Sequence, residues 1–482
     1  MHSNLISSAL CPLLLVAWGC VAVAAETADP LNTEAMLSRE PNLRLAGAVN
    51  DPCETKSETQ ARALSLLGVV NLALCNNPQT RAVWASLRAQ AAQVGVNEAN
   101  YLPSLALSAA DNHNLSGSTS GTHQRSVGLT LSYLLYDFGS RAANLKNARQ
   151  LLAAASATQD STVQSVFIAA IQAYYQTQAT HATLDAASES ERVAKESLAA
   201  AEARYRIGNA TPADKLQAQT AYSQATLNRI TAYGSLKNAQ GVLANIVGRD
   251  ANFLVTLEPA NTIAIPNNWE SDINALIASA RQHRPDLQAA AAQVKAAAAS
   301  VDEARAADRP TISLSATANQ LNSTSLNSHG SSIGINLSVP IFSGYAPTYR
   351  VRAAEAQVEV RNSQFEQLRL QVALDVWTAY QNLTTATQSL RTTADLLNSA
   401  EQSNRVALGR YKAGVGSILD VLTAQSALAS ARQQRVQSTF NWNISRAILA
   451  QSLGELDVNL IQTLSEVSGQ SSDTNPIPNH QP

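Results

Sequence analysis

The sequence has few of the residues that build a large globular core. Only 5% of its 482 residues are aromatic, and beyond the N-terminus no apolar run reaches the length of a transmembrane helix. Alanine, glutamine, serine and threonine are abundant, which favours thin helical walls that are wet on both sides. If the chain enters a membrane, we therefore expect it to do so with β-strands.

An excess of charge of one sign is also lacking, because 34 basic residues stand against 36 acidic ones. This balance removes the electrostatic case for a nucleic-acid partner. The sequence contains no HExxH, GxSxG, Walker loop or paired-cysteine metal motif, and its histidines are scattered. An enzyme is therefore the weakest functional class, and we expect neither a cofactor nor a metal site.

The N-terminus has the pattern of a secretory signal peptide. An apolar run at residues 10–23 is too short to span a bilayer comfortably and ends in small residues before Glu26. We expect cleavage after Ala25, so that residues 1–25 form the signal. Cys20 leaves a lipoprotein signal open as an alternative, although the bulky Trp18 fits such a signal poorly.

Cysteine is scarce in the mature chain, where only Cys53 and Cys75 remain. An exported protein meets an oxidising compartment, and an even pair there predicts a disulfide. A metal site is the weaker interpretation, because no histidine or second cysteine lies nearby at ligand spacing.

The most informative pattern is an internal duplication. "RYRIGNATPADKLQAQ" begins at Arg204 and "RYKAGVGSILDVLTAQ" begins at Arg410, 206 residues later, while Pro78 matches Pro285 at an offset of 207. We therefore interpret the mature chain as two copies of one unit. The expected segments are 26–77, a first repeat at 78–248, a linker at 249–284, a second repeat at 285–454 and a C-terminal segment at 455–482. The last of these is rich in Ser, Pro, Asn and Gln and is expected to be disordered from about residue 467.

Each repeat predicts the same order of elements: a helix ending at a proline, two strands, a very long helix, a tight turn and a return helix. The stretch from Ser140 to Ile207 contains no Gly or Pro, and an unbroken helix of that length would extend about 100 Å. In the second repeat the apolar residues Val376, Leu383, Leu390 and Leu397 recur at coiled-coil spacing. A soluble coiled-coil scaffold would explain the helices equally well.

The predicted strands occupy residues 104–114, 125–136, 311–321 and 331–341. Apolar and small polar residues alternate along them, and each has about the length of a tilted membrane strand. Soluble hairpins packed on a core would show the same alternation, but the export signal and the long helices favour lipid. An open strand edge in lipid costs several kcal/mol per unpaired group. Four strands cannot close a barrel, so two or three chains would have to combine.

The duplicated unit, the proline-bounded strand pairs and the R-Y-x-x-G-x-x-[ST]-x-x-D turns resemble the TolC family of outer-membrane efflux and secretion proteins. The resemblance covers roughly residues 60 to 460, and the opening "ALCNNPQTRAVWASLRAQ" is most similar to the branch serving type I protein secretion. It implies a mainly α protein with membrane β: long coiled-coil hairpins would form a periplasmic α-barrel, with the 249–284 linker at its equator. Four strands per chain would join a homotrimeric twelve-stranded outer-membrane β-barrel.

The same resemblance implies an exit duct in the outer membrane that extends into the periplasm. Its partners would be a periplasmic adaptor protein, an inner-membrane ABC or proton-driven transporter and outer-membrane lipid, with no nucleic acid. The alternative from another functional class is a periplasmic coiled-coil adaptor or scaffold.

The two turn motifs supply the candidate functional residues. Helix caps are expected at Gly208, Thr211, Gly414 and Ser417. Asp214 and Asp420 stand three residues after the expected N-caps, so each could complete a capping box at the positive end of a helix dipole.

The resemblance gives the turns a second role at the periplasmic entrance, and the capping and gating interpretations both stay open. The candidate entrance residues are Asp420, Tyr411, Thr423, Gly416, Asp214 and Tyr205. Asp420 would help to form an acidic ring, whose crowding would raise its pKa and attract cations. Tyr411 would join the links that hold the entrance shut. The sequence departs from the family pattern at Thr423, in place of a second aspartate, and at Gly416, in place of a basic lock residue.

Overall fold

A computed structural model of the chain describes residues 29–37, 63–116, 119–253, 255–258, 272–323 and 327–456. The predicted signal peptide, Cys20, Cys53 and the C-terminal tail from residue 467 lie outside the described residues. Cys75 is disulfide-bonded, and its pairing with Cys53 stays a prediction.

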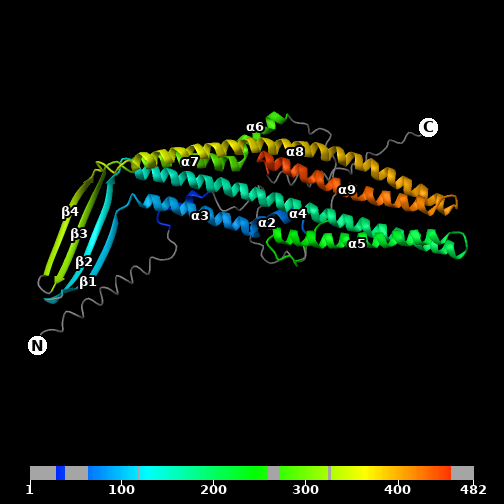
Figure 1. The fold of residues 1–482 in the computed structure, drawn as a ribbon, viewed down its shortest axis with the longest axis horizontal. Coiled ribbons are helices and arrows are strands. Elements are labelled where there is room, and N and C mark those ends of the chain that lie inside the picture. The colour runs from blue at the N-terminus through cyan, green and yellow to red at the C-terminus, as the bar shows by residue number, and fades with distance from the viewer. Residues whose placement is uncertain are drawn as a thin grey trace, which may run out of the picture. The chain divides into compact units, whose positions relative to one another are not determined.

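The described elements repeat in pairs, which confirms the duplication (Figure 1). A short 3₁₀ helix, η1 (Thr33–Met36), comes first. The first copy contains α2 (Leu66–Asn76), α3 (Pro78–Ala99), β1 (Ser104–Ser116), β2 (Thr119–Tyr136), α4 (Ser140–Arg206) and α5 (Pro212–Ile246). The second contains α6 (Ile273–His283), α7 (Pro285–Ala306), β3 (Thr311–Ser323), β4 (Asn327–Ser338), α8 (Ala346–Lys412) and α9 (Ile418–Leu453). The long helices α4 and α8 have 67 residues each, and α2 and α6 have 11 each. Sequence analysis did not identify the α2 and α6 pair.

The internal contacts divide the chain into two compact units. One is built from parts of residues 1–38, 86–156 and 292–361 and contains all four strands. The other is built from parts of residues 39–85, 157–291 and 362–482 and contains the two helix turns. Among the described residues, no helix combines the length and the apolar character needed to cross a bilayer.

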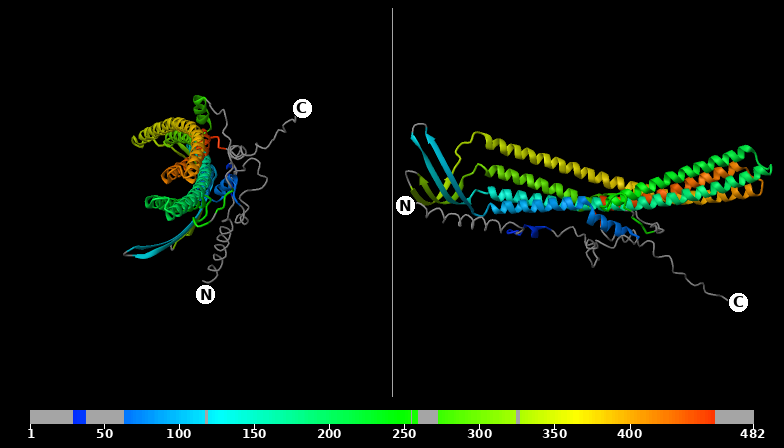
Figure 2. Two further views of the ribbon diagram at one scale, coloured as in Figure 1. Left: turned by 90° about the vertical axis from the view of Figure 1, so that its right-hand side faces the viewer. Right: turned by 90° about the horizontal axis from the view of Figure 1, so that it is seen from below.

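The four expected strands form one antiparallel sheet in the order β1-β2-β3-β4, and the strand direction rotates from one hairpin to the next (Figure 2). The register of the strands places apolar residues on one face of the sheet and small or polar residues on the other. One row contains Leu105, Leu131, Ala316 and Ile333, and the adjacent row on the other face contains Ala106, Thr130, Thr317 and Ser332. β1 and β3 continue two residues beyond the predicted ends. β4 ends at Ser338, short of the predicted 341, because Pro340 cannot donate to a strand ladder.

The heptad residues of α8 form a seam with α9, which confirms the coiled-coil prediction. Val376, Leu383 and Leu390 are buried, and Leu383 and Leu390 share a cluster with Trp442 of α9. The indole Nε1 of Trp442 donates to the Thr387 hydroxyl at 3.2 Å. A buried Trp with a satisfied N–H fixes the register of the two helices.

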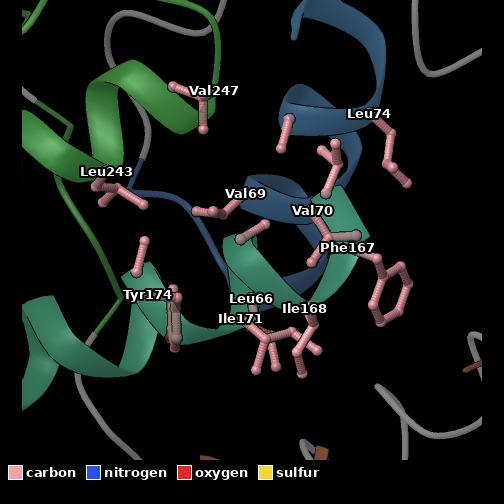
Figure 3. Packing of buried hydrophobic residues seen from close by; sticks show 14 of the residues in the cluster. Leu66, Val69, Val70, Leu74, Phe167, Ile168, Ile171, Tyr174, Leu243 and Val247 are labelled. Atoms are coloured by element: carbon pink, nitrogen blue, oxygen red, sulfur yellow. The ribbon is translucent and has the colours of Figure 1, made fainter. Parts of the chain in front are cut away.

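The largest apolar cluster gathers where α2 packs on the long helices (Figure 3). Val69 and Val70 of α2 are fully buried and lie toward Phe167 of α4 and toward Leu243 of α5. α9 completes the cluster with Ile444. Both hairpins are therefore tied into one core.

Two glycines at equivalent positions of the two repeats allow α5 and α9 to end close to neighbouring backbone. Gly248 has φ +73° and Gly454 has φ +78°, both in the left-handed region. A Cβ on Gly248 would lie 2.5 Å from the carbonyl oxygen of Asn76, and one on Gly454 would lie 2.9 Å from the backbone of His283. Glycine is therefore required at both positions by conformation and by space.

Candidate functional site: the paired helix turns and the apolar sheet face

The α4–α5 and α8–α9 turns share one backbone geometry. Gly208 and Gly414 have φ of +76° and +79°. In the first turn the N–H of Asn209 donates to the carbonyl of Arg204 at 2.9 Å, and in the second the N–H of Val415 donates to that of Arg410 at 3.0 Å. Each turn is therefore a Schellman motif that satisfies the last carbonyls of a 67-residue helix.

Capping boxes open both return helices. The Thr211 N–H donates to the Asp214 carboxylate at 2.8 Å, and the Asp214 N–H donates back to the Thr211 hydroxyl at 3.2 Å. Ser417 and Asp420 exchange the same two bonds, each at 3.1 Å. The two glycines and the two hydroxyl residues thus occupy the cap positions for which they were proposed.

The capping bonds also set the ionisation of Asp420. The backbone N–H of Ser417, then its hydroxyl and the charge of Arg410, lower the pKa of the Asp420 carboxyl. Crowding in an acidic ring would act in the opposite direction. In the single chain the direction is downward, because the donors of the capping box favour the charged form.

The structure brings the two turns together through one side chain, Arg204. Its guanidinium carbon lies 4.1 Å from the centre of the Tyr411 ring, and its Nη2 donates to the carbonyl oxygens of Tyr411 and Lys412. Only 7% of Tyr411 is exposed. Its hydroxyl has no hydrogen-bond partner among the described residues. Arg204, which lies just before the α4–α5 turn, therefore caps the C-terminal end of α8 and covers the ring of Tyr411.

The remaining entrance residues do not join this contact. Tyr205 is 43% exposed, and Thr423 lies exposed about one helical turn after Asp420. A Cβ on Gly416 would lie 3.1 Å from Arg410 Cβ and from the Tyr411 nitrogen, so a larger residue there would require these atoms to move. A glycine in place of a basic residue thus suits the tightness of this turn.

Sequence reasoning missed the role of Arg204, although a signal was present. Both turn motifs begin with Arg-Tyr, so an arginine stands beside each tyrosine. What the sequence could not show is that Arg204 contacts the tyrosine of the other turn.

The sheet carries the second candidate surface, an apolar band on one face. Leu105, Leu107, Ile333 and Ile335 are each between 65% and 76% exposed, and they lie on the same face by register. Toward the hairpin tips the same face becomes charged, where Arg125 and His123 each lie 3.4 Å from the Asp111 carboxylate. The band is therefore bounded by charge at one end.

The opposite end of the band has exposed aromatic residues. Tyr136 stacks edge-on against Phe138 with ring centres 4.6 Å apart, and Phe342 lies edge-on to Tyr345 at 6.2 Å. All four are exposed. An exposed apolar band flanked by aromatic residues is the pattern of a lipid-facing β-barrel wall.

Comparisons with known proteins agree with this geometry. A family model described as outer membrane efflux protein matches residues 69–249 and 276–455, one match per repeat. Protein CyaE of Bordetella pertussis is 32% identical over 419 residues, covering 85% of this chain and 88% of that protein. Outer membrane protein TolC of Vibrio cholerae is 24% identical over 403 residues, covering 82% and 91%. The crystal structure of the CmeC outer membrane channel of Campylobacter jejuni superposes with a TM-score of 0.73 at 19% identity, covering 84% of this chain and 89% of that one.

Proposed function

Because the chain belongs to the family of outer membrane efflux proteins, we propose that it is the exit duct of a tripartite efflux or type I secretion system. The relatives are outer-membrane channel proteins, and this chain is an outer-membrane channel subunit that extends into the periplasm. The periplasmic adaptor or scaffold, which was the alternative, is not the class to which the comparisons point. The exposed apolar band on the four-stranded sheet is the observation that carries the proposal.

The sheet supports an assembly of three chains. In the described part of the chain β1 and β4 each pair on one side only, so both outer edges present unpaired backbone groups. In lipid each unpaired group costs several kcal/mol, and the sheet must close with strands of other chains. Three copies give twelve strands, which leave room for a pore, and the edge β4 of one copy would pair with β1 of the next.

The proposed partners follow from the position of the chain in such a system. A periplasmic adaptor protein and an inner-membrane transporter would deliver the substrate, and outer-membrane lipid would cover the apolar band. The opening of the first repeat favours the type I secretion branch of the family.

The paired turns would form the periplasmic entrance. Asp420 is exposed at the start of α9, where three copies would place a ring of carboxylates at the mouth. Such a ring favours the passage of cations. Arg204 would replace the missing basic lock at Gly416, since it holds Tyr411 from the neighbouring turn.

Two measurements on the purified full-length protein test the proposal. Native mass spectrometry in detergent should give three copies, and planar bilayers should show discrete cation-selective conductance steps. Asp420→Ala should reduce cation selectivity, while Thr423→Ala, one turn along the same helix, should leave it unchanged. Recovery of the protein in the soluble fraction without detergent would contradict the proposed channel function. The absence of conductance in planar bilayers would contradict it as well. Unchanged selectivity in Asp420→Ala would leave Asp420 as a helix cap only.

A further inference from the structure

Two histidines lie side by side near the tip of the first hairpin of the sheet. They stand ten residues apart in the sequence, and only the pairing of β1 with β2 brings them together (Figure 1). His113 is directly opposite His123 in the strand register, and their ring centres lie 4.4 Å apart with the ring planes tilted by 41°. Two imidazoles on one face of the hairpin are therefore held beside each other by the register of the strands.

The carboxylate of Asp111 contacts one of these rings. Its Oδ1 lies 3.4 Å from Nδ1 of His123, and its Oδ2 lies 3.4 Å from Nε of Arg125. A carboxylate at Nδ1 favours the tautomer in which Nδ1 carries the proton, so that the lone pair of the ring is on Nε2. Histidines that bind metal ions in proteins commonly have such a carboxylate at their other nitrogen. Asp111 therefore orients His123 as a ligand that binds through Nε2.

A cation can reach both rings from the solvent. His113 and His123 are exposed, with 53% of the His123 side chain accessible. The positive charge of Arg125 is offset by the negative charge of Asp111, which it contacts at 3.4 Å. The surroundings of the two rings therefore do not carry a net positive charge that would repel a cation.

The two histidines also lie beyond the apolar band of the sheet. Odd-numbered residues of β1 share one face, on which Leu105 and Leu107 belong to the band, while Asp111 and His113 follow toward the tip. His113 stands eight residues after Leu105, which at about 3.4 Å per residue corresponds to roughly 27 Å along the strand. The apolar band of a membrane barrel is about 25 Å tall. In the proposed channel the two rings would therefore lie in water rather than in lipid.

We propose that His113 and His123 together bind one divalent ion of the late first-row transition metals, the class of Zn²⁺, Ni²⁺ and Cu²⁺. Imidazole nitrogen is a preferred ligand of these ions, whereas Mg²⁺ and Ca²⁺ are bound by oxygen. In the described part of the chain, no group of three or more histidine, cysteine or carboxylate side chains is placed to hold a metal ion. The site therefore has two protein ligands, and water completes the coordination. An ion held in this way links β1 to β2 near their turn, and the site does not depend on the proposed channel function.

Calorimetric titration of the full-length protein, purified without a histidine tag, tests the site with ZnCl₂ and NiCl₂. The wild type should bind one ion per chain with an affinity that depends on both histidines. Asp111→Asn should weaken binding about 10-fold, since loss of the carboxylate behind a metal-binding histidine costs 10–100-fold in affinity. His113→Ala and His123→Ala should each cost at least as much, because each leaves a single imidazole. MgCl₂ should not bind at this position.

The chain offers two matched control histidines. His181 on α4 has its Nδ1 3.0 Å from the Asp185 carboxylate, and no other histidine stands within a turn of it on that helix. His329 is on β4, opposite Gln320 of β3. His181→Ala and His329→Ala should leave the zinc affinity unchanged. Unchanged affinity in His113→Ala or in His123→Ala would overturn the site, and so would an equal loss in His181→Ala.

Copper in place of zinc counts the imidazoles directly. Cu²⁺ added at one ion per chain should show electron spin-echo modulation from two coordinated imidazoles in the wild type. His113→Ala and His123→Ala should each show modulation from one imidazole at most. Modulation from a single imidazole in the wild type would show that the two histidines do not share the ion and would contradict the proposal.

Hydrogen exchange tests whether the ion links the two strands. An ion that binds only the paired hairpin, present at ten times its dissociation constant, lowers local opening about 10-fold. Asn112 and Gln124 pair across the strands next to the two histidines. Exchange of the protected amides around them should slow by that factor when Zn²⁺ is added, and it should not slow in His113→Ala. An unchanged rate in the wild type at saturating Zn²⁺ would refute a site shared by β1 and β2.

Discussion

Removing the Arg204 side chain should release the second turn from the first. The substitution Arg204→Ala deletes a guanidinium stacked 4.1 Å from the Tyr411 ring centre and two hydrogen bonds to carbonyls at the end of α8. A cation–π contact contributes about 0.5–2 kcal/mol, and a hydrogen bond from a charged donor contributes about 1.5–3 kcal/mol. Arg204 is only half-buried, and its bond to the Lys412 carbonyl is long at 3.5 Å. We therefore take the lower ends for the cation–π contact and for the one hydrogen bond to Tyr411, and expect a loss of about 2 kcal/mol. That loss corresponds to roughly a 30-fold increase in local opening.

Hydrogen exchange at the turn measures this opening. The amides of Gly414 and Val415 donate to carbonyls of Tyr411 and Arg410 and close the Schellman motif. Their protection should fall by roughly 30-fold in Arg204→Ala, because local opening controls their exchange. Arg206→Ala, in the same helical turn, controls for the loss of charge. If both variants lose the same protection, Arg204 acts only through its charge. That result would refute a clamp in which Arg204 holds Tyr411 and the end of α8.

Three further predictions concern other parts of the fold. Gly208→Ala should lower the free energy of unfolding by about 1 kcal/mol, because the residue has a positive φ and open space around it. Gly248→Ala should lower the melting temperature further, because its Cβ would also lie 2.5 Å from the Asn76 carbonyl oxygen. Equal melting temperatures for the two variants would contradict this close approach. The stabilisation of α9 by Asp420, whose pKa is lowered from 3.8, should be complete above that value and lost as pH falls through the lower pKa. Exchange of the first amides of α9 against pH measures it, and Asp420→Asn should abolish the dependence. Trp442→Phe should destabilise the α8–α9 seam by about 1–2 kcal/mol, because it leaves Thr387 without its buried donor; denaturant unfolding measures the change, and an unaltered midpoint would show that the bond is dispensable.

The periodic features of the fold were accessible from the sequence. The duplication is visible as a constant offset, and the alternation in β1 to β4 follows from the period of two in any strand. The turns were also readable, because Gly414 and Ser417 belong to cap motifs whose geometry is local.

Contacts between segments were not accessible in the same way. The clamp between Arg204 and Tyr411 joins residues that are far apart in the chain, and nothing local decides which turn contacts which. Helix α2 was missed for a different reason. Ser65 caps it, and apolar residues follow at helical spacing, so a signal existed. The helix is only 11 residues long and lay outside the repeat boundaries that the prolines suggested.

In the proposed channel one face of the sheet meets lipid and the other meets water. Spin labels placed one at a time along β4, at residues 333 to 337, in the protein inserted in a bilayer test it most directly. Ile333, Ile335 and Leu337 should be accessible to oxygen, which dissolves in lipid, whereas Gly334 and Asn336 should be accessible to a water-soluble nickel chelate. A period-two alternation of the two accessibilities is the predicted result. Low accessibility of the apolar positions to both reagents would show that the sheet packs on a protein core, and would contradict the account.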